Sequence, residues 1–513
     1  MSSSISAPAF YGLNTQESGV TLQEGFALQA DNCVIDKYGR LGSRKGWQTL
    51  STKKDGSTNG NNGVNLTGVS NFKDVVGADT LLSFSVNKFY KGLTNLVTLT
   101  PSTGDTIAAG NWQTATLNNH HYFFQRGYLP LVYTNDGGAD TFQSIVTHSG
   151  RAGTPPSAHT VLAAYGRLWA ADTATNKNTV SFTDVLDGTA WSGGTSGNIN
   201  ISSVLTQGMD EIVALGAHNG FLVIFCKNNI IIYGDGNNFQ AGMTTASLTL
   251  VEVIEGVGCI ARDSVQNTGE DILFLSNTGI RSLSRTIQEK SQPMRDISKN
   301  VRDDVIQAIN SENINLIKST YSPTNAFYLI TFPTSQQTFV FDTRTPLEDG
   351  SFRATIWPSV SPKGFLSIDS TLYFAEANGI AEYKGYQDDG SKYEMAYYSR
   401  FFDLGMANVS KIVKKLSATT VGATGQTFAL KIGYDYSPVY FSYTFTLDTG
   451  TVFEYGITEY GIGKYSGSVL IDEQKASTQG SGDIIQIGFT TDISGAPMSL
   501  QKISLYAKQG KVL

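Results

Sequence analysis

Histidine and aspartate side chains are the groups in this sequence whose spacing could support metal chemistry. His120 and His121 are neighbours in an expected strand, where consecutive side chains point to opposite faces, so a shared metal is disfavoured. Residues 234–238 (GDGNN) could wrap calcium, but their spacing matches no calcium loop and is typical of a turn. We therefore expect no metal and no other cofactor.

A second group of polar residues surrounds Asp184 and the run 187–191 (DGTAW), which is similar to the aspartate box of sialidase-type propellers. The spacing differs by one residue and the motif occurs once, which favours a β-turn with a tryptophan plug. The sequence contains no HExxH, GxSxG, Walker loop or paired CxxC. We expect no enzyme activity, although carboxylates that converge from separate blades would leave no local motif.

The composition indicates a large protein rich in short strands. The chain has 513 residues, of which 40% are apolar, 16% charged and 53 glycine, and its net charge of −7 argues against a nucleic-acid clamp. Short basic runs such as Arg44-Lys45 are expected on a solvated surface. Cys226 and Cys259 lie in apolar runs and are expected to be buried thiols. The N-terminus lacks a signal pattern and residues 221–226 are too short to span a bilayer, which predicts synthesis in a reducing cytoplasm.

The stretch 271–357 has the clearest local organisation. Ser276 to Gly279 forms a tight turn between apolar runs, which predicts a β-hairpin. A four-residue repeat then predicts a short amphipathic helix capped by Asp296 or Ser298, with its apolar positions at Ile297, Val301, Val305 and Ile309. Two further hairpin strands, a third strand and Trp357 follow. We interpret this stretch as one blade-like unit with an insertion.

Hairpins of the same kind recur along the chain. Their turns are centred near residues 87, 127, 176, 228, 278, 335 and 378. The spacing of about forty to sixty residues is typical of propeller blades with insertions. We therefore predict an all-β chain in which residues 51–390 form a β-propeller of six to eight blades, with an inserted short helix.

The two ends of the chain differ from this middle part. Residues 1–50 have few alternating strands and are interpreted as an extended arm that closes the first blade. Residues 391–513 alternate with period two between glycine-rich turns, including one at Asp448-Thr449-Gly450, which predicts a C-terminal antiparallel β-sandwich.

All three parts resemble the tail nozzle (tail tubular, tail hub) proteins of short-tailed bacteriophages, the podoviruses. The opening matches the pattern GL.T..S...L..G.A..A.N..ID..GRL..RKGW, which includes Arg44-Lys45-Gly46-Trp47. The middle contains YSPTN.FYLITFP, FVFD.R and a tryptophan, and the chain closes with GSGDIIQIGFTTDISGAPMSLQKISLYAKQGK. Blade number and inserted loops vary across that family.

The resemblance implies a structural virion protein that is made in the host bacterial cytoplasm. Such proteins form a ring, commonly a homohexamer, below the portal and tail adaptor, next to tail fibres or spikes. They retain the genome and become the channel for DNA ejection, without membrane anchoring. Two alternatives remain open: a propeller glycoside hydrolase or lyase that acts on host surface polysaccharide, and a monomeric carbohydrate-binding propeller.

The resemblance and the composition suggest two sets of functional residues. For the arm, we expect buried contacts across the propeller or onto a neighbouring subunit, through Leu13, Leu22, Phe26, Arg40 and Trp47. For the channel, the segment from 203 to 271 has eight acidic residues against two basic ones. A solvated outer face is the favoured interpretation of this charge, and the alternative hypothesis is that part of it, at Glu252, Glu255 and Asp263, faces the ring lumen. An acidic wall lets DNA slide, because it does not bind phosphates. The polar loops 234–238 and 51–65 are then candidates for a steric gate.

Overall fold

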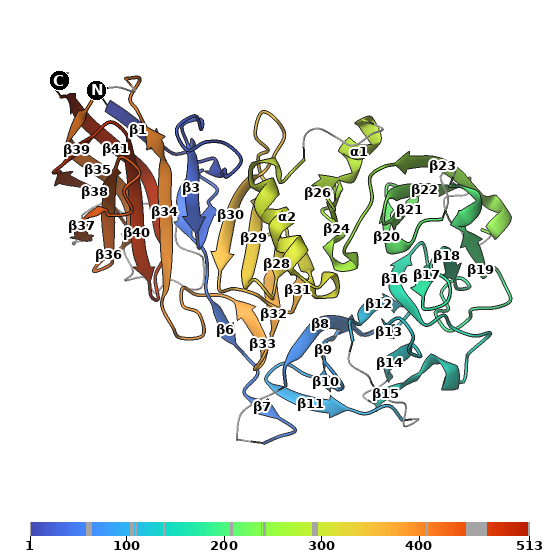
Figure 1. Ribbon diagram of the computed structural model, residues 1–513. Coiled ribbons are helices and arrows are strands. Elements are labelled where there is room, and N and C mark those ends of the chain that lie inside the picture. Colours follow the sequence, from blue (N-terminus) through green and yellow to red (C-terminus); the bar gives the residue numbers. More distant parts are fainter. Residues whose placement is uncertain are drawn as a thin grey trace.

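The structure is a computed structural model and is built almost entirely from antiparallel β-sheets. It describes residues 2–57, 64–102, 107, 110–136, 139–205, 209–236, 239, 243–289, 296–406, 409–447 and 469–510. Figure 1 shows two joined parts: a ring of sheets and, beside it, a packed pair of sheets that carries both chain ends. The predicted all-β class, a propeller with a β-sandwich, is confirmed.

Six four-stranded blades make up most of the ring, and in each blade the strands pair in antiparallel order. The first strands of the second, third and fourth blades contact one another in turn, as do those of the fifth, sixth and first blades. The blades comprise β8 (Leu66–Lys73), β9 (Asp79–Ser85), β10 (Phe89–Lys91) and β11 (Asn95–Leu99); β12 (Gln113–Leu117), β13 (His120–Phe124), β14 (Leu131–Asp136) and β15 (Ala139–Ser144); β16 (Ala158–Ala164), β17 (Arg167–Thr173), β18 (Thr179–Phe182) and β19 (Gly197–Asn200); β20 (Ile212–His218), β21 (Phe221–Cys226), β22 (Asn229–Asp235) and β23 (Leu248–Glu255); β27 (Lys318–Ser322), β28 (Phe327–Phe332), β29 (Gln337–Asp342) and β30 (Arg353–Pro358); and β31 (Gly364–Ile368), β32 (Thr371–Glu376), β33 (Gly379–Tyr383) and β6 (Trp47–Thr49).

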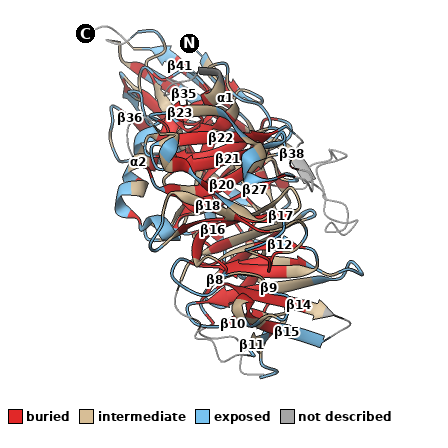
Figure 2. Cartoon of the chain, turned by 90° about the vertical axis from the view of Figure 1, so that its right-hand side faces the viewer, coloured by how far each residue is buried: buried red, intermediate tan, exposed pale blue. Residues whose placement is uncertain are grey.

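A shorter three-stranded sheet, β24 (Gln266–Asn267), β25 (Ile272–Ser276) and β26 (Gly279–Ser282), lies between the fourth blade and β27. All seven predicted turns fall between the second and third strands of these sheets. The burial shown in Figure 2 explains why the hairpins could be predicted from apolar runs in the sequence. The middle strands, such as β21 and β22, are buried, whereas loops and edges are exposed.

The stretch 271–357 is not one blade, because it is divided between the three-stranded sheet and the blade that starts with β27. Helices α1 (Leu283–Glu289) and α2 (Arg302–Ser311) lie between the two sheets in the chain. The predicted helix exists, and Ile297, Val301 and Val305 are buried as expected. The α-helix begins at Arg302, directly after a 3₁₀ turn, Lys299–Val301, whose N-cap residue is Ser298, one of the two predicted caps. The Ser298 side chain makes no capping bond, and its hydroxyl accepts a hydrogen bond from the Ile280 amide at 3.0 Å.

The N-terminal segment closes the ring, but at a different blade from the one predicted. Strand β6 supplies the outer strand of the last blade by pairing with β33, and β7 (Lys53–Lys54) then adds to the first blade beside β11. Both pairings need backbone partners far away in sequence, so local patterns could not assign them.

The sandwich contains strands from both ends of the chain. One sheet comprises β1 (Ser2–Ser6), β4 (Cys33–Ile35), β5 (Leu41–Ser43), β35 (Lys411–Ala423), β38 (Val469–Ser477), β39 (Ser481–Gly482) and β41 (Met498–Gln509). The other comprises β2 (Gly12–Leu13), β3 (Phe26–Asp31), β34 (Tyr393–Phe402), β36 (Thr427–Tyr434), β37 (Phe441–Thr446) and β40 (Ile485–Ile493). Because β3 also pairs with β30, this second sheet continues into a propeller blade. Residues 1–50 therefore supply strands to both the sandwich and the propeller, and they do not form a separate arm.

Two remaining expectations concern turns and membranes. The predicted turn at residues 448–450 lies outside the described residues. Among the described helices, none is long and apolar enough to cross a membrane.

Candidate functional site at the propeller axis

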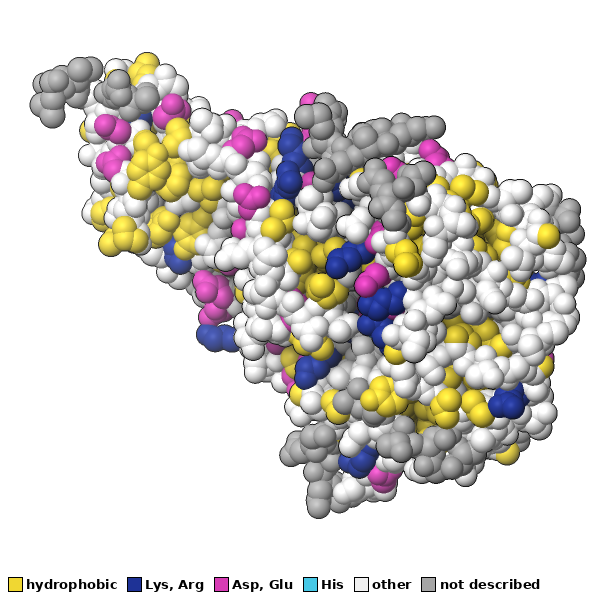
Figure 3. Space-filling model, turned by 45° about the vertical axis from the view of Figure 1, so that its right-hand side comes forward, with side chains coloured by type: hydrophobic (Ala, Val, Ile, Leu, Met, Phe, Trp, Pro, Cys, Tyr) yellow, Lys and Arg dark blue, Asp and Glu magenta, His cyan; other side chains and the backbone are white. Residues whose placement is uncertain are grey.

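A cavity of about 510 Å³ opens at one mouth of the propeller axis. It is lined by residues that directly precede inner strands, such as Asn65 and Lys363, and by turns between second and third strands, such as Arg126 and Pro333. The sheets thus position this site collectively. Figure 3 shows Lys and Arg side chains gathered with a few Asp and Glu side chains near the hollowed centre of the face in view.

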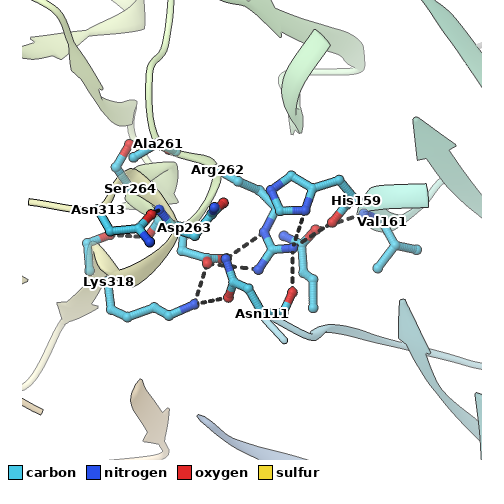
Figure 4. A network of polar contacts seen from close by, with 12 residues as sticks. Asn111, His159, Val161, Ala261, Arg262, Asp263, Ser264, Asn313 and Lys318 are labelled. Carbon is cyan, nitrogen blue, oxygen red and sulfur yellow. Dashed lines mark hydrogen bonds and ion pairs between the residues drawn. The ribbon is translucent and has the colours of Figure 1, made fainter. Parts of the chain in front are cut away.

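A polar network cross-links the inner strands beside this cavity (Figure 4). The Arg262 guanidinium donates to both carboxylate oxygens of Asp263, at 2.9 and 2.8 Å, and to the His159 carbonyl at 2.6 Å. It also donates to the Asn111 carbonyl at 3.0 Å. Lys318 Nζ lies 2.5 Å from Asp263 Oδ2 and donates to Asn111 Oδ1. These contacts join three blades to the loop that precedes the three-stranded sheet.

The carboxylate and the imidazole of the network each have one protonation state at neutral pH. Burial would raise the pKa of Asp263, but the charges of Arg262 and Lys318 outweigh it and hold that pKa well below its usual value. Burial, together with the nearby Arg262, lowers the pKa of His159 to about 2. At neutral pH, Asp263 is therefore ionised and His159 is neutral, so neither group is poised to exchange a proton.

A second cavity of about 180 Å³ shares Thr67 and Lys318 with the mouth cavity. Its lining includes Arg262 and Asp263 together with inner-strand residues of the first and last blades. Asp263 is the one carboxylate among the described residues that line the two cavities. Most glycosidases use a pair of such groups, whereas the described lining of the two cavities places one carboxylate beside cations and amides.

The three expected channel residues are not brought together. Glu252 and Glu255 lie on β23, the outermost strand of its blade, where Glu255 is exposed and Glu252 half-buried. Asp263 lies at the axis and is bound by two cations. The proposed gate loops are only partly described, because residues 237–238 and 58–63 lie outside the described residues.

The expected arm residues are buried by contacts within this chain. Leu13, Leu22, Phe26 and Arg40 are buried, and Trp47 packs half-buried against the last blade. Their contacts to a neighbouring subunit stay a prediction.

Arg44 was expected on a solvated surface, and this is wrong because its side chain is only 1% exposed. Its guanidinium donates to both oxygens of Asp388, at 2.7 and 2.6 Å, and to Asn32 Oδ1 at 2.8 Å. It also lies 3.9 Å from the centroid of the Tyr393 ring. Arg44 therefore joins the sandwich to the end of the last blade.

The other candidate residues have structural partners. Asp184 accepts from the Thr195 amide and hydroxyl, and Asp187 accepts from the Thr189 amide, as expected of turns. His121 is buried and is hydrogen-bonded to the side chains of Thr116 and Ser70, whereas His120 is half-buried. The three cysteines are buried free thiols, and no group of three or more metal-ligating side chains occurs among the described residues.

Sequence reasoning missed the axial residues Asn111, His159 and Lys318. They are single polar residues separated by tens to hundreds of positions, so no local motif marks them. Only the ring closure brings them together.

Comparisons with known proteins add no functional information. No protein-family model matches the chain, and no curated protein matches it. Similar solved structures include BamB from Moraxella catarrhalis (10% identity, 74% of this chain and 95% of that chain, TM-score 0.38). They also include the WD40 domain of Toxoplasma gondii coronin (9%, 69% and 86%, 0.36) and YCF48 bound to D1 peptide (10%, 63% and 92%, 0.36). At these identities and scores, the matches carry no argument about function.

Proposed function

We propose that this chain is a structural subunit of the tail nozzle of a short-tailed bacteriophage. Six copies would form a ring below the portal and adaptor, retain the genome and provide the channel for its ejection. The sequence resemblance described above motivates this proposal.

The observation that carries it is the position of the residues in the resembling motif. Arg44 binds Asp388, and Trp47 pairs with Tyr383 in the last blade. A Cβ atom on Gly46 would lie 1.9 Å from the Gln387 carbonyl oxygen, so only glycine fits there. The residues of the motif therefore connect the sandwich to the propeller. Such connections suit a protein whose role is architectural.

The structure reduces the number of residues that could give the ring lumen an acidic wall. Asp263 contributes no free negative charge, because Arg262 and Lys318 compensate it. Glu252 and Glu255 remain candidates only if the outer edge of their blade faces the lumen of the ring.

The test uses the phage that encodes the chain. An amber mutation in its gene should give, in a non-suppressing host, heads that package DNA and then lose it, without a nozzle density in electron micrographs. Antibodies to the chain should label the tail of wild-type particles. Tailed, infectious particles that lack the chain would exclude this function.

The polysaccharide-cleaving alternative finds less support. The described lining of the axial cavities supplies one carboxylate, and that carboxylate is held by two cations. Release of reducing ends from host polysaccharide by the purified chain would restore this alternative.

A further inference from the structure

The mouth cavity of the propeller axis has the size and charge of a binding site for a small anion. Its volume of about 510 Å³ is in the range of small-molecule sites. Its described lining contains three cationic side chains, Arg126, Lys318 and Lys363, and none that is acidic. This inference holds whether or not several copies of the chain assemble into a nozzle ring.

Carboxylates behind the lining compensate only part of this charge. Lys318 lies 2.5 Å from Asp263, which also binds Arg262, and Arg126 contacts the buried Asp172. Four cations, namely Arg126, Arg262, Lys318 and Lys363, thus lie against two carboxylates. The surplus is two positive charges when Glu376, which acts on Lys363, is protonated, and one when Glu376 is ionised. It lies beside a concave and partly desolvated surface, where charge acts over short distances with little screening.

Lys363 is the cation best placed to contact a ligand. Its Nζ donates to the neutral Asn65 Oδ1 at 2.6 Å, so this partner leaves the lysine charge uncompensated. Glu376 also acts on Lys363 electrostatically, but burial raises the pKa of Glu376 to about 7. Below neutral pH, Glu376 is mostly protonated and the positive charge of Lys363 dominates.

Amide donors accompany the cations. Asn111 Oδ1 accepts from Lys318, which orients its Nδ2 group as the remaining donor, and no hydrogen bond to another described residue uses that group. Val86, Leu316 and Pro333 supply apolar wall. A pocket with a few convergent polar groups on an apolar wall is the usual composition of a ligand site.

We propose that the mouth cavity binds a small ligand through a carboxylate or phosphate group, with Lys363 and Asn111 as direct contacts. The two possible sources of this oxyanion are an acidic sugar and a free phosphate.

The experiment is isothermal titration calorimetry of the full chain at about pH 6, where Glu376 is mostly neutral. The probes are galacturonate, inorganic phosphate and galactose, which differs from galacturonate in lacking the carboxylate. We expect saturable binding of galacturonate, phosphate or both, weakened by salt, and none of galactose. The oxyanion that binds identifies the source.

Lys363→Gln should weaken binding about ten-fold, the loss expected for one charge-assisted hydrogen bond, and Lys363→Arg should retain it. The matched control is Lys392→Gln, because Lys392 also donates at 2.6 Å but lies on the sandwich. The proposal is overturned if neither oxyanion binds, if galactose binds equally well, or if Lys363→Gln binds as the wild type does. Should Lys363→Gln not fold, the galacturonate and galactose comparison on the wild type decides alone.

Discussion

Gly364 lies against Gly68 where the last blade meets the first. A Cβ atom on Gly364 would be 2.8 Å from the Gly68 Cα and 3.2 Å from the Thr67 carbonyl oxygen. Both neighbours are backbone atoms, which cannot move aside as a side-chain end can. The two inner strands can therefore approach this closely only because position 364 is glycine, whereas a Cβ atom on Gly68 would meet the Phe84 ring of its own blade at 2.2 Å.

Gly364→Val should consequently destabilise the propeller by roughly 1–3 kcal/mol, the usual effect of overpacking. Thermal unfolding followed by circular dichroism would measure this as a lower apparent melting temperature. Gly236→Ala is the control, because no described residue lies within 4 Å of a Cβ atom there. Equal melting temperatures for the two variants would show that the ring tolerates a wider junction.

Asp388→Asn should destabilise the joint between the sandwich and the propeller by about 2 kcal/mol, because it leaves the buried Arg44 guanidinium without its charged acceptor. Asp492→Asn removes an exposed ion pair with Lys392, and its effect should stay below about 0.5 kcal/mol. Urea unfolding of the two variants compares a buried pair with an exposed one. A similar, small loss in both would mean that Arg44 finds another acceptor.

Glu376 should make stability fall as pH rises. Its pKa is raised by burial to about 7 in the folded chain, from a usual value of 4.5. Between these values the folded chain binds more protons than the unfolded chain, so the stabilisation present at low pH is lost toward pH 7. Glu376→Gln should flatten the decline in melting temperature across this window. Parallel pH profiles for wild type and variant would assign the decline to other groups.

Deleting residues 2–30 should prevent the sandwich from forming, because it removes β1, β2 and most of β3, the strand between β30 and β34. We expect insoluble protein or loss of cooperative unfolding. Deleting residues 2–6 removes only β1, a mostly exposed strand that pairs with β41 alone, and should leave a soluble chain. A soluble deletion of residues 2–30 with unchanged melting temperature would contradict this role of the N-terminal strands.

The repeated hairpins could be predicted from sequence because each is a local unit. Strands β21 and β22, for example, are apolar runs joined by a turn two residues long, and pattern alone identifies them. The partner of β6 could not be predicted, since it pairs with β33 more than three hundred residues later. The axial network has the same difficulty: Lys318 and Asn111 are 207 residues apart, and neither belongs to a recognisable motif. Acidic composition likewise identified Asp263 without indicating that two cations bind it.

The interleaving of both chain ends in the sandwich has a consequence for synthesis. Strands β1, β3 and β5 leave the ribosome first, but their partners β41 and β34 lie near the opposite end of the chain. These N-terminal strands therefore remain without these partners until β34 and β41 have also been translated. Contacts of such long sequence separation fold slowly, so newly made chains pass through a period in which unpaired strand edges are open to chaperones, proteases and other nascent copies.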